Sequence, residues 1–92
     1  MLRVRPAKCV CDFLKGLPEK IFYQIWRKIL TLAENPCQQD LKKIGIYQDK
    51  DVFRVDTGEY RIIYQYDLQD LWLLLIGKRN DSEVYKEYKR KY

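Results

Sequence analysis

The sequence predicts a single α+β domain in which a small antiparallel sheet carries its helices on one face. Two segments repeat their apolar residues with helical spacing, one before Asn35-Pro36 and one at the C-terminal end. Between them lie three runs rich in β-branched and aromatic residues, which are typical of strands. The length of 92 residues favours one domain, residues 1–92, over two.

The first 36 residues predict a strand followed by a helical hairpin, both packed on the sheet. Residues 2–5 alternate apolar and polar side chains, which indicates a short strand. Helical spacing then predicts a helix over residues 7–15, ended by Gly16. A second helix begins at Pro18 and runs to about Glu34. Its apolar stripe consists of Phe22, Ile25, Ile29 and Leu32.

The second half of the chain predicts the sheet. Residues 37–50 are polar and irregular, and their expected anchors in the core are Leu41, Ile44 and Ile46. The three expected strands are Val52–Asp56, Glu59–Tyr66 and Leu71–Gly77. Thr57-Gly58 is the expected turn between the first two strands.

A last helix is expected at the C-terminal end. Asn80 and Glu83 have the spacing of a capping box, which marks the start of a helix. This helix carries Val84, Tyr85, Tyr88 and Tyr92 among its charged residues.

The absence of histidine excludes several kinds of catalysis. It removes the Ser-His-Asp and Cys-His relays, the histidine-liganded zinc sites and the usual proton shuttle at neutral pH. Any catalysis is therefore expected to use arginine, lysine, tyrosine and carboxylates. No cofactor is expected. The net charge of +5 is concentrated at the two ends of the chain and suits an anionic partner.

The cysteines and the hydropathy indicate a compartment. Cys9, Cys11 and Cys37 are odd in number, and no signal peptide is recognised, so we expect reduced thiols in the cytoplasm. The spacing Cys9-x-Cys11 is not that of a zinc knuckle or a redox motif. The longest apolar run, Leu71–Ile76, is far short of the ~20 residues that span a bilayer, so no membrane partner is expected.

A register argument points to a phosphate site on the first hairpin. If Thr57-Gly58 is a two-residue turn, Arg54 lies directly opposite Arg61 on one face of the sheet. Like charges in that position destabilise a sheet, and a bound phosphate is a common reason for them. The alternative is that both arginines are solvated and neutralised by Asp56 and Glu59. Both interpretations remain open at this point.

The end of the third strand extends this cationic region. Lys78 and Arg79 follow Gly77, and sequential strand order places Arg79 near Arg61. Tyr85 follows six residues later and is expected to overhang the same pocket. Aromatic rings beside cations are typical of single-stranded nucleic-acid recognition.

These motifs resemble the RelE branch of the RelE/ParE toxin superfamily over nearly the whole chain. The matching elements, in order, are the hairpin from Leu17-Pro18 to Asn35-Pro36, Leu41-Lys42-Lys43, Gly58-x-Tyr60-Arg61-x-x-Tyr64, Gly77-Lys78-Arg79 and Val84-Tyr85. The resemblance implies the RelE-like fold. It also implies a toxin of a type II toxin–antitoxin system that cuts mRNA in the ribosomal A site without a metal. Its implied partners are a cognate antitoxin, mRNA, the ribosome and, only through the toxin–antitoxin complex, operator DNA.

The resemblance also implies roles for individual residues. Arg61 would bind the scissile phosphate, Arg79 would stabilise transition-state charge and the leaving group, and Tyr85 would stack on a base. Arg54 matches a basic residue on the preceding strand, and we expect RNA contacts from Lys78, Lys42 and Lys43.

Two positions depart from the RelE pattern. Asp56 stands where RelE has a second basic residue on the strand, and Asp81 stands where it has a further arginine. The general base is therefore left unassigned, with Asp56 and Lys78 as candidates. Two other functions remain open. One is a ParE-like toxin that inhibits DNA gyrase by binding, and the other is a small basic RNA-binding or degenerate toxin module that is active only through its antitoxin complex.

Overall fold

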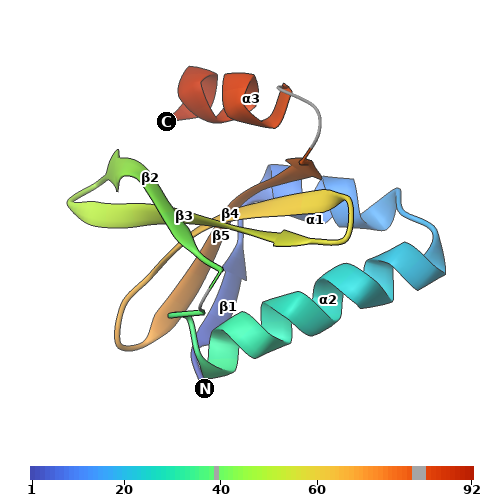
Figure 1. The fold of residues 1–92 in the computed structure, drawn as a ribbon, viewed down its shortest axis with the longest axis horizontal. Helices are drawn as coiled ribbons and strands as arrows, with labels where there is room; N and C mark the ends of the chain where they lie inside the picture. Colours follow the sequence, from blue (N-terminus) through green and yellow to red (C-terminus); the bar gives the residue numbers. More distant parts are fainter. Residues whose placement is uncertain (39, 80–82) are drawn as a thin grey trace.

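The computed structural model describes residues 1–38, 40–79 and 83–92, which form one five-stranded sheet and three helices (Figure 1). The elements are β1 (Arg3–Pro6), α1 (Lys8–Lys15), α2 (Glu19–Glu34), β2 (Lys42–Tyr47), β3 (Lys50–Thr57), β4 (Tyr60–Tyr66), β5 (Asp70–Lys78) and α3 (Glu83–Lys91). The predicted α+β class is confirmed, and so are both helices of the N-terminal hairpin.

The sheet has the strand order β1-β5-β4-β3-β2. Strands β3, β4 and β5 are antiparallel neighbours, as the sequence predicts. Strand β2, which the sequence does not predict, adds to β3 in antiparallel, and β1 joins the edge of β5 in parallel. Arg3 and Arg5 both contact the carboxylate of Asp70, at 3.1 and 2.7 Å, and thereby tie β1 to the start of β5. The sheet is therefore mixed rather than wholly antiparallel.

The main core lies between the sheet and the α1–α2 hairpin. The predicted stripe of α2 forms it: Ile25, Ile29 and Leu32 are fully buried, and Phe22 packs at its margin. From the sheet, the main contributors are Val55, Ile62, Tyr64, Leu71 and Leu73. The periodicity of α2 thus determines which of its faces meets the sheet.

The third helix lies on the opposite face of the sheet, so the expectation that all helices share one face is wrong (Figure 1). The reason is that the central strands are apolar on both faces. Ile62 and its neighbour Ile63 point to opposite faces, yet neither is exposed to solvent. Val84 of α3 covers Ile63 in a second cluster, together with Val52, Leu74 and Leu75.

Strand β2 lies in the segment that the sequence analysis took to be irregular. It pairs with β3 through a turn at Gln48 and Asp49, whose φ angles of 51° and 64° are those of a type I′ turn. The turn lacks the Asn-Gly signal that usually announces this geometry, which explains why it was missed. Of the three expected anchors, Leu41 and Ile44 pack against the core clusters, but Ile46 is 64% exposed.

The β3–β4 turn is shifted by one residue from the predicted position. Gly58, at φ 58°, is the first of the two turn residues, and Thr57 pairs with Tyr60. Glycine at the first position with a positive φ is the type II′ pattern. The neighbouring Gln24 of α2 also lies so close that a Cβ on Gly58 would be 2.0 Å from its side-chain nitrogen. The positive φ is what favours glycine here, because the exposed side chain of Gln24 can move aside for a Cβ.

This shift changes the pairing of the charged residues. Asp56 lies directly opposite Arg61, and Arg54 lies opposite Ile63, so the predicted Arg54–Arg61 pair is wrong. The two arginines still share one face of the sheet, because the side chains at 54 and 56 point the same way.

The predicted capping residue Asn80 lies outside the described residues, whereas the helix that it would cap is present as α3.

In the part of the chain that the structure describes, no helix is long and apolar enough to cross a membrane.

Candidate active site

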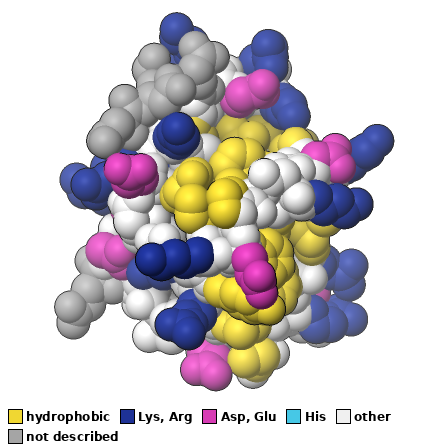
Figure 2. All heavy atoms as spheres, turned by 90° about the vertical axis from the view of Figure 1, so that its right-hand side faces the viewer, with side chains coloured by type: hydrophobic (Ala, Val, Ile, Leu, Met, Phe, Trp, Pro, Cys, Tyr) yellow, Lys and Arg dark blue, Asp and Glu magenta, His cyan; other side chains and the backbone are white. Residues whose placement is uncertain are grey.

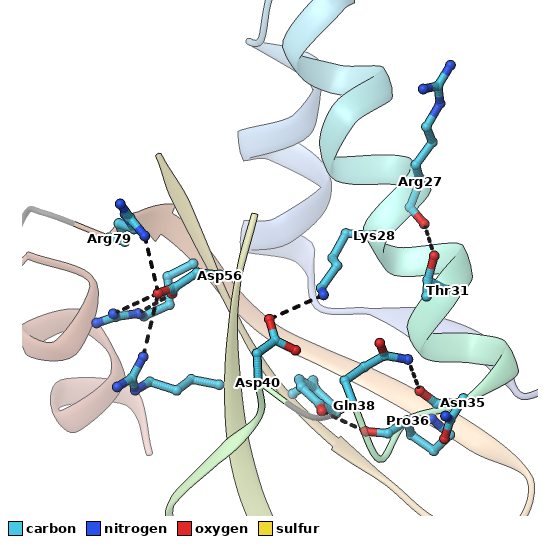
Figure 3. Close-up of polar contacts among 12 residues, drawn as sticks. Arg27, Lys28, Thr31, Asn35, Pro36, Gln38, Asp40, Asp56 and Arg79 are labelled. Atoms are coloured by element: carbon cyan, nitrogen blue, oxygen red, sulfur yellow. Dashed lines mark hydrogen bonds and ion pairs between the residues drawn. The ribbon is translucent and has the colours of Figure 1, made fainter. Parts of the chain in front are cut away.

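A carboxylate surrounded by arginines lies at the end of the sheet that carries the β3–β4 turn. Arg61 contacts both oxygens of Asp56, with Nε 2.8 Å from Oδ1 and Nη2 3.3 Å from Oδ2. Oδ2 is also 3.8 Å from Nη1 of Arg54 and 3.8 Å from Nη1 of Arg79 (Figure 3). We call these four residues the arginine cluster.

Three neighbouring strands position the arginine cluster. Arg54 and Asp56 are two residues apart on β3, and Arg61 is the cross-strand partner of Asp56 on β4. Arg79 follows the end of β5, where its backbone N–H donates to the carbonyl of Glu59 at 2.8 Å. The sequential strand order is what brings Arg79 beside Arg61, as the sequence predicts.

Tyr85 of α3 completes the site. Its hydroxyl accepts a hydrogen bond from Nη1 of Arg61 at 2.7 Å, and the guanidinium carbon lies 5.0 Å from the ring centroid. Gly77 allows this approach, because a Cβ there would lie 3.1 Å from the side chain of Val84. Tyr85 therefore overhangs the arginine cluster as expected.

The site is partly open to solvent. The exposed fraction of the side chain is 12% for Arg61, 18% for Arg54, 27% for Asp56 and 46% for Arg79. Arg79 is thus the most accessible cation of the cluster, and Arg61 is the most enclosed.

Hydrogen bonds and neighbouring charges favour the ionised forms of Asp56 and Arg61. The hydrogen bonds from Arg61 hold the pKa of Asp56 below its ordinary value of 3.8, reinforced by the charges of Arg61, Arg54 and Arg79. The same hydrogen bonds raise the pKa of Arg61. A carboxylate with a lowered pKa is a weaker proton acceptor, which bears directly on Asp56 as a candidate base.

The lysines named from the sequence lie in three different settings. Lys42 is the cross-strand neighbour of Arg54 and extends the cationic row on that face. Lys43 forms an ion pair with Asp51 at 3.1 Å. Lys78 pairs with Tyr60, whose side chain lies in the core on the other face, so the register directs Lys78 away from the arginine cluster. Asp81 lies outside the described residues.

Within the described residues, no group of three His, Cys, Asp or Glu side chains is arranged to hold a metal ion. Cys9, Cys11 and Cys37 are free thiols. One of the two interpretations of the sequence names Asp56 as a neutralising neighbour of Arg61, but it does not predict that the two residues lie directly opposite each other. The signal was the glycine itself: a turn with Gly58 as its first residue places the opposite charges of positions 56 and 61 face to face.

Solved structures of RelE and of RelE–antitoxin complexes align with most of this chain. A chain of the archaeal RelE–RelB complex from Pyrococcus horikoshii aligns with a TM-score of 0.73 and 25% identity, covering 85% of this chain and 94% of that one. Isolated RelE from E. coli aligns with a TM-score of 0.67 and 20% identity, covering 99% and 98%. A chain of the toxin–antitoxin complex RelBE2 from Mycobacterium tuberculosis aligns with a TM-score of 0.69 and 21% identity, covering 85% of this chain and 98% of that one. No family model and no curated protein matches the sequence.

The chain therefore has the fold of the RelE toxins. The resemblance to the RelE branch that its motifs predict is confirmed.

Proposed function

We propose that this protein is the toxin of a type II toxin–antitoxin system and an endoribonuclease that cuts mRNA on the ribosome. The observation that carries the proposal is the convergence of Arg54, Arg61 and Arg79 on Asp56, with the ring of Tyr85 against Arg61. The similarity to RelE toxins and RelE–RelB complexes supports a toxin that is controlled by an antitoxin.

The geometry suits a reaction in which the RNA supplies its own nucleophile. The 2′-hydroxyl gives up its proton to a base and attacks the adjacent phosphorus. The bond to the 5′-oxygen breaks, that oxygen takes up a proton, and a 2′,3′-cyclic phosphate remains. Arg61 and Arg54 would hold the scissile phosphate, while the more accessible Arg79 would stabilise the charge that develops on it and on the leaving oxygen. Tyr85 would stack on a base and hold the nucleotides splayed for in-line attack.

The molecular surface is compatible with a polyanionic substrate. Figure 2 shows a face on which Lys and Arg side chains lie around a hydrophobic area, with Asp and Glu side chains between them. The net charge of +5 would favour the approach of RNA. We expect the cognate antitoxin to cover the arginine cluster. Operator DNA should be bound only by the toxin–antitoxin complex, and the protein should act in the cytoplasm.

Growth arrest on expression tests the proposal. We expect Arg79→Ala to abolish the arrest, because each donor that stabilises a transition-state anion contributes about 3–4 kcal/mol. Arg27→Ala is the matched control: it removes the same charge from an exposed position on α2 and should arrest growth as the wild type does. Purified wild-type protein should also cut mRNA on programmed ribosomes.

Two outcomes would contradict the proposal. A fully toxic Arg79→Ala variant would remove Arg79 from the chemistry. A gyrase-dependent DNA-damage response, without RNA cleavage, would instead favour the ParE-like alternative.

A further inference from the structure

The arginine cluster already contains an anion of its own. Asp56 accepts two hydrogen bonds from Arg61, and its Oδ2 lies 3.8 Å from both Arg54 and Arg79. Guanidinium groups engage carboxylates and phosphates through the same two-point geometry. The carboxylate therefore occupies the position in which three arginines would otherwise hold a phosphate.

The donors of Arg61 are largely committed in this arrangement. Its Nε and Nη2 edge is used by Asp56, and Nη1 donates to the hydroxyl of Tyr85. A guanidinium has five N–H donors, and two-point recognition of a phosphate uses one whole edge. A phosphate that binds through the Nε and Nη2 edge of Arg61 must therefore compete with Asp56 for that edge.

We propose that Asp56 is an internal ligand of the arginine cluster, which holds the three arginines together in the free protein and is displaced by an RNA phosphate. This inference rests on the proposed function, since it takes RNA as the displacing anion. It gives Asp56 a role other than that of general base. Its cost is weaker RNA binding, and its benefit is that the arginines converge before the substrate arrives.

The same arrangement links stability to bound anions. Three guanidinium groups around one point repel one another, and Asp56 offsets that repulsion. Without its charge, the folded state should be less stable and should gain more from an added anion, because an anion that binds only the folded state stabilises it by mass action.

The test compares Asp56→Asn with Asp40→Asn. Both substitutions remove one negative charge from an ion pair, but Asp40 pairs with Lys28 of α2, away from the arginine cluster (Figure 3). The first measurement is the Kd for a 2′-O-methyl RNA oligonucleotide, which cannot be cleaved, at fixed ionic strength. We expect Asp56→Asn to bind about tenfold more tightly than wild type, a change of about 1.4 kcal/mol, and Asp40→Asn to stay within about twofold.

The second measurement is the melting temperature as a function of inorganic phosphate. Asp56→Asn should melt below wild type without phosphate and should rise more steeply as phosphate is added. If the variant is unfolded in the absence of phosphate, the inference requires that phosphate restores its folding. Asp56→Glu, which keeps the carboxylate, should retain the weaker RNA affinity of the wild type.

Unchanged or weaker RNA binding by Asp56→Asn, relative to Asp40→Asn, would overturn the inference, as would a phosphate response equal to that of the wild type. Neither measurement requires cleavage. A protein that shows both effects but leaves mRNA intact would refute the proposed nuclease and keep Asp56 as an anion-site ligand. A protein that cuts mRNA but shows neither effect would keep the proposed nuclease and refute the role of Asp56 as an anion-site ligand.

Discussion

Replacing Arg61 and Arg79 with alanine should affect stability very differently, although both residues are assigned to the same reaction. The side chain of Arg61 is 12% exposed and makes two hydrogen bonds to Asp56 and one to Tyr85. Hydrogen bonds to charged groups contribute about 1.5–3 kcal/mol when they are shielded from water. Because the site is partly open, we expect Arg61→Ala to lower the free energy of unfolding by about 2–3 kcal/mol in total.

Arg79 is in a different position. Its side chain is 46% exposed, and its contact with Asp56 is 3.8 Å long. Ion pairs of that kind contribute about 0–1 kcal/mol. Arg79→Ala should therefore leave the free energy of unfolding within about 1 kcal/mol of wild type.

The assay is thermal unfolding followed by circular dichroism. In a domain of this size, 1 kcal/mol corresponds to about 4–8 °C, so Arg61→Ala should melt about 10–20 °C below wild type. Arg79→Ala should melt no more than about 8 °C below it. Equal shifts in the two variants would refute the assignment of Asp56 as the direct partner of Arg61. Arg79→Ala is therefore the better variant for functional tests, because a loss of activity would not result from a loss of folding.

Three further predictions concern the fold and the pH response. Gly58→Ala should cost at least about 1–2 kcal/mol because φ is 58°, whereas Gly16→Ala, at φ −88°, should change stability by less than about 1 kcal/mol; urea unfolding of both checks this. Ile29→Ala should cost about 2–5 kcal/mol because the side chain is fully buried, and its neighbour Leu30, 38% exposed, should tolerate alanine within about 0.5 kcal/mol in the same assay. The lowered pKa of Asp56 means that its stabilising contribution is complete above about pH 4 and is lost as the pH falls through that lowered value. The difference in melting temperature between wild type and Asp56→Asn should therefore be constant from pH 7 to about pH 5 and shrink below about pH 4.

Local patterns in the sequence predict much of the fold. The stripe of α2 gave the correct buried face, because helical periodicity depends only on spacing along one element. The position of α3 depends instead on what covers each face of the sheet. The unbroken apolar run Leu71–Ile76 contained that information, since a strand that is apolar on both faces must be covered on both.

The candidate site shows the same division. The sequence placed Arg61, Arg79 and Tyr85 near one another, and the structure brings them together. The pairing within the site was wrong, because a shift of one residue at Gly58 changes every cross-strand neighbour. In the sequence, Asp56 is a departure from the RelE pattern. In the structure, it is the residue that three arginines contact.

Mapping RNA 5′ ends in cells after induction would show whether Arg79 and its neighbours cut RNA. Wild type should produce new, discrete 5′ ends within coding regions, and Arg79→Ala, expressed to the same level and folded, should produce none. An unchanged pattern of RNA ends during growth arrest by the wild type would contradict the proposed nuclease activity.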